Sequence, residues 1–127
     1  MPRVSLTFFV TAALCGLAGM VWGSYMGATG DHTLFPAHAH LNLLGWVGLS
    51  IMGGFYAIAP RKPGRLAWIN FGLSAGGAVI MAPMLGWLLS GHEAQLGPFM
   101  PIPEGLSILG LVAFLVSILR NWRAAPA

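Results

Sequence analysis

Charged residues are scarce in this chain of 127 residues, of which only 7% are charged and 57% are hydrophobic. A soluble domain normally carries about 25% charged residues. No amphipathic arrangement hides so much apolar surface from water, so the composition predicts an integral membrane protein. We interpret the excess of basic over acidic residues as an effect of membrane topology, and we expect no nucleic-acid partner.

Cysteine is nearly absent, and the single Cys15 lies inside the first apolar run. One cysteine excludes an internal disulfide, and we interpret Cys15 as a small buried core residue. The chain also lacks a Cys-x-x-Cys pair, a nucleotide-binding glycine loop and a catalytic serine pattern. Whether the chain is an enzyme stays open at this stage.

Four apolar segments have the roughly 20 residues that a helix needs to span a bilayer. They cover about residues 5–26, 36–59, 66–90 and 106–122. The first segment resembles a signal peptide, but its length and the lack of a cleavage site predict a retained membrane helix. The sequence therefore predicts an all-α fold, an integral membrane four-helix bundle that forms a single domain over residues 1–127.

The charges predict how the bundle lies in the membrane. All the basic residues flank segment ends that share one side, namely Arg3, Arg61, Lys62, Arg65, Arg120 and Arg123. All the acidic residues fall in the two connections on the other side, namely Asp31, Glu93 and Glu104. The positive-inside rule then predicts cytoplasmic N and C termini in a bacterial inner membrane. It also places all four histidines, His32, His38, His40 and His92, at the outer face.

The first segment carries small residues at spacings of three or four, namely Ala12, Gly16, Gly19, Gly23 and Gly27. Such a ladder lets helices approach closely in lipid. We favour close helix packing as its role, and room for a flat cofactor is the alternative.

The second segment begins with a pair of histidines, His38 and His40. On a helix they lie about 200° apart around the axis, so they point to nearly opposite sides and serve separate sites. His38, Asn42 and Gly45 share one face of this helix. Ionisable residues in a membrane segment are costly and mark function by default. Asn42 needs a hydrogen-bond partner there, and it either holds a neighbouring helix or steadies a ligand.

Four further features lie in the second half of the chain. Asn70 lies near the predicted cytoplasmic end of the third segment, where we expect water to satisfy it. Pro83 should kink that segment or locally free a backbone carbonyl. His92, beside Glu93, is a candidate metal ligand or proton acceptor, or else an interfacial histidine in water. Residues 95–104 are rich in proline, which predicts a stiff loop folded over the site.

The second segment resembles a known membrane helix. Its runs Ala37-His38-Ala39-His40, Leu44-Gly45-Trp46-Val47-Gly48 and Gly53-Gly54-Phe55-Tyr56 resemble the tenth transmembrane helix of subunit I of haem-copper oxidases, with the C family closest. The resemblance covers roughly 24 of the 127 residues. In that family the first histidine binds the high-spin haem, and the second binds the low-spin haem across the helix. The resemblance implies haem b bound through His38 and His40. The glycines of this helix, among them Gly45, permit either tight packing or a porphyrin plane against the backbone, so Asn42 and Gly45 are candidate cofactor contacts.

The family's subunit I has twelve helices in three arcs of four, and the second helix of each arc carries metal-binding histidines. This chain resembles one such arc, so we expect a homo-oligomer, with a trimer favoured because three arcs complete the ring. The family's copper-site histidines, its cross-linked tyrosine and the histidine on its second helix have no counterpart here. One copy therefore cannot be an oxygen reductase.

Two function classes follow. The first is a membrane haem protein for electron transfer or diatomic gas binding at the outer face. The alternative is a non-enzymatic accessory subunit or copper-handling protein of a respiratory complex, with a respiratory-chain protein as partner besides the lipid bilayer. A copper handler would more often show clusters of methionine and cysteine. The methionines here are scattered, so haem is favoured, with copper at His38, His40 and His92 left open.

Overall fold

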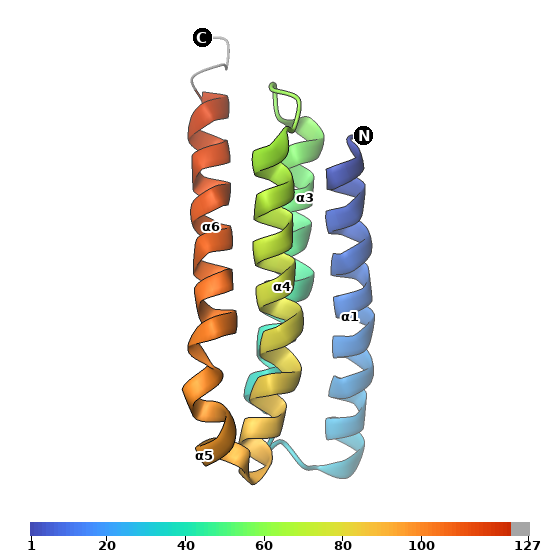
Figure 1. Ribbon diagram of the computed structural model, residues 1–127. Helices are drawn as coiled ribbons and strands as arrows, with labels where there is room; N and C mark the ends of the chain where they lie inside the picture. Colours follow the sequence, from blue (N-terminus) through green and yellow to red (C-terminus); the bar gives the residue numbers. More distant parts are fainter. Residues whose placement is uncertain (123–127) are drawn as a thin grey trace.

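The computed structural model describes residues 1–122, and these residues form helices joined by short connections, with no strand among them (Figure 1). Four stretches are long and apolar enough to cross a membrane: Arg3–Thr29, Phe35–Ile58, Arg65–Phe99 and Pro101–Trp122. The all-helical fold and the four membrane-length helices are thus confirmed. Arg123, which contributed to the predicted topology, lies outside the described residues.

The first helix, α1 (Arg3–Thr29), is longer at both ends than the predicted residues 5–26. It ends at Gly30, whose φ of 70° lies in the left-handed region. The Gly30 N–H donates to the Met26 carbonyl at 2.9 Å. Glycine adopts this backbone conformation without a steric penalty, which is why the helix stops here.

The second membrane helix has three parts: α2 (Phe35–His40), the π-helical η1 (Leu41–Gly48) and α3 (Leu49–Ile58). The sequence predicted its existence and approximate ends but not the π-helical part. π-helical turns are rare and occur frequently at functional sites. Here the π-helix begins directly after His40.

The third membrane helix starts as α4 (Arg65–Trp87), which continues through Pro83. The break in helical backbone angles lies further on, inside η2 (Leu88–His92), where Gly91 has φ 99°. The chain turns there because glycine alone adopts that angle readily. This turn at Ser90 and Gly91 was not predicted.

The connection to the last helix is helical as well. It consists of α5 (Glu93–Leu96) and the short 3₁₀ turn η3 (Gly97–Phe99), and α6 (Pro101–Trp122) follows. The prediction of a loop over 95–104 and a helix start at 106 was wrong. Pro101 and Pro103 stand in the first turn of α6, where a missing N–H costs no helical hydrogen bond.

In space, α4 packs against α6 on one side and against the second membrane helix on the other, while α1 packs mainly against η1 and α3 (Figure 1). The start of α1, the α3–α4 connection and the end of α6 share one end of the bundle. We call this the basic end, defined by Arg3, Arg61, Lys62, Arg65 and Arg120. The opposite end, with His32, His38, His40 and His92, is the histidine end.

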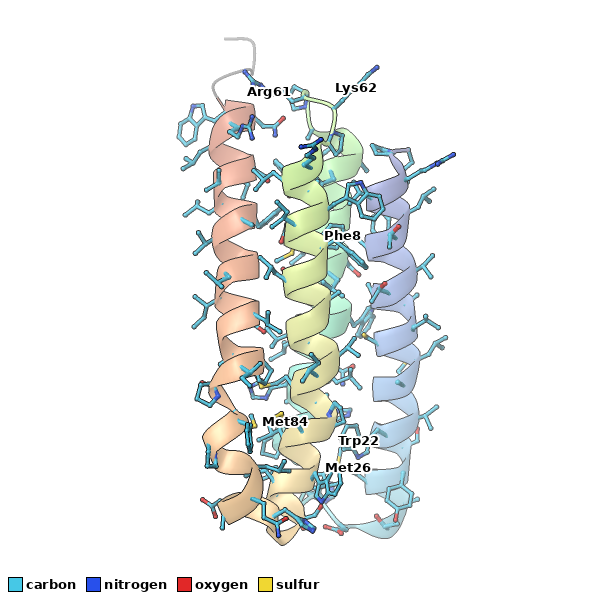
Figure 2. The ribbon with its side chains drawn as sticks, in the orientation of Figure 1. Phe8, Trp22, Met26, Arg61, Lys62 and Met84 are labelled. Carbon is cyan, nitrogen blue, oxygen red and sulfur yellow. The ribbon has the colours of Figure 1, made fainter. Side chains whose placement is uncertain are left out.

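The half of the bundle near the basic end has an aromatic core. Phe8 of α1 is fully buried and stacks on Tyr56 with ring centroids 5.6 Å apart (Figure 2). Phe71 meets Phe8 edge-on at 5.1 Å, and Phe114 of α6 closes the cluster. Toward the histidine end a second, smaller core cluster contains Cys15, Leu41 and Ala82, with Trp22 packed against it.

A chain of hydrogen bonds crosses this core. The Ser74 hydroxyl donates to Asn70 Oδ1 at 2.9 Å, and Asn70 Nδ2 donates to the Tyr56 hydroxyl at 3.1 Å. The Tyr56 hydroxyl in turn donates to Ser117 Oγ at 2.9 Å. Asn70 has 0% exposure, so the prediction that water satisfies it was wrong. The polar chain connects α3, α4 and α6.

Glycine–serine pairs bring α4 and α6 together. A Cβ at Gly77 would lie 2.8 Å from the Ser107 backbone nitrogen, and a Cβ at Gly110 would lie 2.8 Å from that of Ser74. Each helix therefore contributes one glycine and one serine to the contact. Small residues allow such close approach of helix backbones in a membrane.

Candidate functional site at the histidine end

The small residues of α1 pack against the face of the second membrane helix that carries His38, Asn42 and Trp46. A Cβ at Gly23 would lie 3.0 Å from His38 Cε1, and one at Gly19 would overlap the Asn42 amide. A Cβ at Gly16 would lie 3.0 Å from the Trp46 ring. The prediction of close packing along the ladder is confirmed for these glycines. Gly27, in contrast, has no neighbour within 4 Å.

The π-helical turn helps to keep these side chains aligned. His38, Asn42 and Trp46 are four residues apart, and four residues of an α-helix exceed one turn by about 40°. A π-helical turn, which bonds residues five apart, takes more residues and reduces this drift. The three side chains therefore face α1 together.

Asn42 contacts His38 in two ways. Its side-chain amide donates to the His38 carbonyl at 2.9 Å. The same nitrogen lies 3.3 Å from Nδ1 and 3.4 Å from Nε2 of the imidazole. If the Asn42 nitrogen lay in the plane of the imidazole ring, these two similar distances would place it in overlap with the ring carbons. The amide therefore lies over the face of the ring. It therefore leaves the in-plane lone pair of His38 free.

The remaining neighbours of His38 are aromatic. The Trp22 ring of α1 lies edge-on at 6.4 Å between centroids, and the Phe35 ring lies at the same separation, tilted by 42°. His38 is half-buried between α1 and α2. Its ring is thus held by Gly23, Asn42 and two aromatic side chains.

His40 is arranged differently. Its side chain is exposed, and Nδ1 lies 2.7 Å from the Pro36 carbonyl oxygen. A carbonyl can only accept, so Nδ1 carries the proton and donates it to Pro36. With that proton on Nδ1, the lone pair of the uncharged form of the ring lies on Nε2. Metal-binding histidines are oriented in the same way, by donating the other ring N–H to a carbonyl or carboxylate.

Gly45, predicted beside a cofactor, is buried against α1. A Cβ there would lie 2.8 Å from Cys15 Cβ and 2.9 Å from its sulfur. Cys15 fills the space beside Gly45, so this glycine serves helix packing within the chain. Asn42 likewise holds its own helix and contacts the ladder, while it also contacts the candidate ligand His38.

His92 lies apart from the other two candidate ligands. Its Nδ1 is 3.2 Å from the Trp87 carbonyl, and its ring meets the Trp87 ring edge-on at 5.6 Å. Within residues 1–122, no three side chains among His, Cys, Asp and Glu come together as a metal site. The structure therefore does not bring His38, His40 and His92 to one ion within a single chain.

The connection between α1 and α2 is shaped by Asp31. The Thr33 hydroxyl and the Thr33 backbone N–H donate to Asp31 Oδ1 at 2.6 and 3.0 Å. These bonds stabilise the carboxylate and hold the pKa of Asp31 below its ordinary value. His32 Nδ1 donates to the Gly30 carbonyl at 3.0 Å. Both side chains thus complete a turn.

Comparison with other proteins adds no further assignment. No protein-family model, curated protein or solved structure matches this chain. The function must therefore be argued from the residues themselves.

Imidazole nitrogens are common ligands of haem iron, and α2 carries two imidazoles. His40 Nδ1 donates to the Pro36 carbonyl, and within residues 1–122 the Asn42 amide is the only hydrogen-bonding group against the ring nitrogens of His38, over its face. The rings belong to opposite sides of one helix, as the two-residue spacing predicted: His38 contacts α1 and His40 is exposed. One chain therefore does not clamp a flat ring between them. A bis-imidazole site needs a second copy.

Proposed function

We propose that this chain is a membrane haem protein that serves electron transfer or diatomic gas binding at the histidine end. The observation that carries the proposal is the arrangement of His38 and His40, two available imidazole nitrogens on opposite sides of a helix at a π-helical turn. The proposal agrees with the resemblance of this helix to one from subunit I of haem-copper oxidases. Haem b would supply one-electron redox chemistry or an iron that binds a gas.

In this proposal the oligomer is part of the site. His40 is exposed on one protomer, and His38 lies between α1 and α2 of its neighbour. A ring of protomers would place one haem at each interface, with one imidazole from each side. A trimer is the favoured assembly because three four-helix arcs would reproduce the twelve helices of the resembling family.

The proposed orientation follows from the separation of charge. The basic end carries the described arginines and the lysine, whereas Asp31 and Glu93 lie in the connections at the histidine end. The positive-inside rule then places the basic end, with both termini, in the cytoplasm of a bacterium. The protein would be a multi-pass inner-membrane protein with its histidines at the outer face.

The residues around the ligands would position them and limit access of water. The Pro36 carbonyl fixes the ring of His40, and Asn42 contacts the face of His38. Trp22 and Phe35 surround His38 with apolar surface. An apolar shell and fixed hydrogen bonds are the means by which a protein tunes a haem.

The proposal is tested on the purified full chain by its visible spectrum, oxidised and reduced, and by its haem content per chain. His38→Ala and His40→Ala should each lose haem or change its spectrum. The matched control is His32→Ala, which removes a histidine from the same end without touching α2. Haem-free protein, or full haem and an unaltered spectrum in both variants, would favour the accessory or copper-handling role instead.

A further inference from the structure

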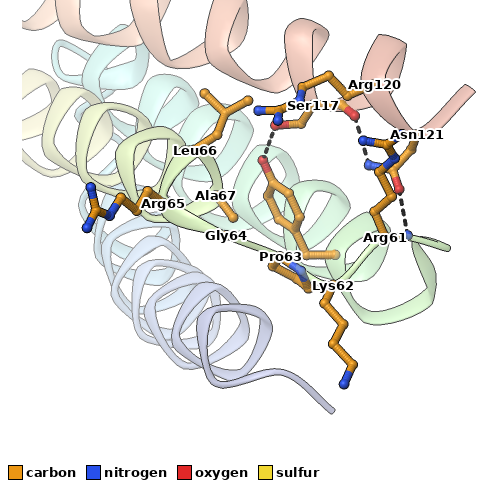
Figure 3. Close-up of a pocket in the computed structure, with 11 residues that line it drawn as sticks. Arg61, Lys62, Pro63, Gly64, Arg65, Leu66, Ala67, Ser117, Arg120 and Asn121 are labelled. Atoms are coloured by element: carbon orange, nitrogen blue, oxygen red, sulfur yellow. Dashed lines mark hydrogen bonds between the residues drawn. The ribbon is translucent and has the colours of Figure 1, made fainter. Parts of the chain in front are cut away.

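A cavity of about 350 Å³ lies at the basic end, between the α3–α4 connection, the start of α4 and the end of α6 (Figure 3). Its lining residues include Tyr56, Arg61, Lys62, Arg65, Ser117 and Arg120. It lies at the opposite end of the bundle from His38 and His40. The proposed haem site gives it no role.

The cavity is held in shape by hydrogen bonds. The Arg61 backbone N–H donates to Asn121 Oδ1 at 3.0 Å, and Asn121 Nδ2 donates to the Ser117 carbonyl at 2.9 Å. These bonds fix the α3–α4 connection to the end of α6 (Figure 3). Tyr56 and Ser117, which are 3% and 5% exposed, form a polar inner wall. The wall belongs to the hydrogen-bonded chain that continues to Asn70.

The charge of this cavity is of one sign. Four cationic side chains line it, and no carboxylate stands among its lining residues. The three acidic side chains of the sequence, Asp31, Glu93 and Glu104, belong to the connections and helix start toward the other end. The positive-inside rule explains why basic residues gather at this end. It does not explain why four of them line one cavity.

We propose that this cavity binds the phosphate group of an anionic phospholipid. Arginine guanidinium groups bind phosphate through paired N–H donors, and a lysine ammonium adds a further positive charge. Basic pockets between transmembrane helices on the cytoplasmic side bind lipid headgroups of this kind. Exposed apolar side chains stand in the turns of α4 and α6 that carry Arg65 and Arg120, namely Trp68, Leu119 and Trp122. They offer a surface for the acyl chains, which favours a lipid over free phosphate.

The test compares lipids bound to the purified full chain by native mass spectrometry in mild detergent. Phosphatidylglycerol should be retained in preference to phosphatidylcholine, which has the same phosphate but no net charge. Arg120→Gln should weaken that retention about fivefold, as loss of one nearby cation predicts. The matched control is Arg3→Gln, which removes one cation from the same end but does not line the cavity.

Three outcomes would overturn the proposal. Equal retention of the two lipids would show that the cavity does not select the anionic headgroup. An equal loss in Arg3→Gln and Arg120→Gln would assign the effect to the general charge of this end. Displacement of the lipid by millimolar inorganic phosphate, with binding of phosphate alone, would make the site one for the free ion. The readout does not depend on haem, so it separates this inference from the proposed function.

Discussion

Gly23 of α1 lies directly against the imidazole of His38, where a Cβ would come within 3.0 Å of Cε1. The same helix face meets Asn42 at Gly19 and Trp46 at Gly16. The glycine ladder therefore positions a candidate ligand as well as packing two helices. A side chain added at Gly23 must move the His38 ring or separate the helices.

Gly23→Val should consequently displace His38, and we expect it to lower haem content or change the spectrum of the purified protein. The control is Gly27→Val on the same helix, which has no neighbour within 4 Å. Similar spectra for the two variants, with full haem in both, would show that the position of His38 does not matter to the cofactor.

Gly19→Ala should destabilise the bundle by about 1–3 kcal/mol, the usual range for overpacking, because the added methyl group would overlap the Asn42 amide. The measurement is thermal unfolding in detergent, followed by circular dichroism. Gly27→Ala serves as the comparison, and equal melting curves for both variants would contradict the described packing.

Tyr56→Phe should also destabilise the protein, by about 1–3 kcal/mol, because it leaves a buried donor of Asn70 without its acceptor. Tyr25→Phe is the matched control, since Tyr25 is 65% exposed. Adding Asn70→Leu to Tyr56→Phe should recover part of the loss by removing the orphaned donor. If Tyr56→Phe alone is as stable as the unmodified protein, the hydrogen bond from Asn70 to the Tyr56 hydroxyl does not contribute to stability.

Carbon monoxide distinguishes the two haem activities. If both axial positions are held by imidazoles, the reduced protein should keep its spectrum when exposed to the gas. His38→Ala or His40→Ala should then open one position, and carbon monoxide should change the spectrum of any haem that remains. A spectral change in the unmodified protein would assign gas binding instead of electron transfer.

Asp31 gives a prediction about pH. Thr33 donates two hydrogen bonds to the carboxylate, so its pKa in the folded protein lies below the ordinary value of 3.8. A lowered pKa means that these bonds stabilise the turn above pH 3.8 and are lost as the pH falls through the folded pKa. An NMR titration of Asp31 should have its midpoint below that of Asp31 in the denatured chain. A midpoint at or above it would contradict the turn.

Much of the fold could be predicted from the sequence. A helix that spans a bilayer needs a long apolar segment, and the charged residues fall at the ends of these segments or in the connections between them. The four membrane-length helices and the close packing of α1 at Gly16, Gly19 and Gly23 followed from those patterns. The π-helix at Leu41–Gly48, which includes Asn42 and Trp46 at the contact with α1, did not. Local sequence carries no clear signal for a π-helical turn.

The remaining errors have tertiary causes. Asn70 is near a helix end in sequence, yet Tyr56 and α6 cover it, so depth along a helix was a poor guide to exposure. The prolines of residues 95–104 indicated a loop, but two of them occupy the first turn of α6, where proline is tolerated. The contact between Gly45 and Cys15 likewise depends on the angle at which α1 and η1 pack.

The most direct test of the central claim is complementation between two inactive chains. If each haem uses His38 of one protomer and His40 of the next, chains with His38→Ala and chains with His40→Ala should each lose bound haem when expressed alone. Co-expressed and purified together, they can form an interface that contains one intact His38 and one intact His40. The account predicts that these mixed oligomers regain haem with the spectrum of the unmodified protein. Mixed oligomers as poor in haem as either variant alone would contradict a haem shared between protomers.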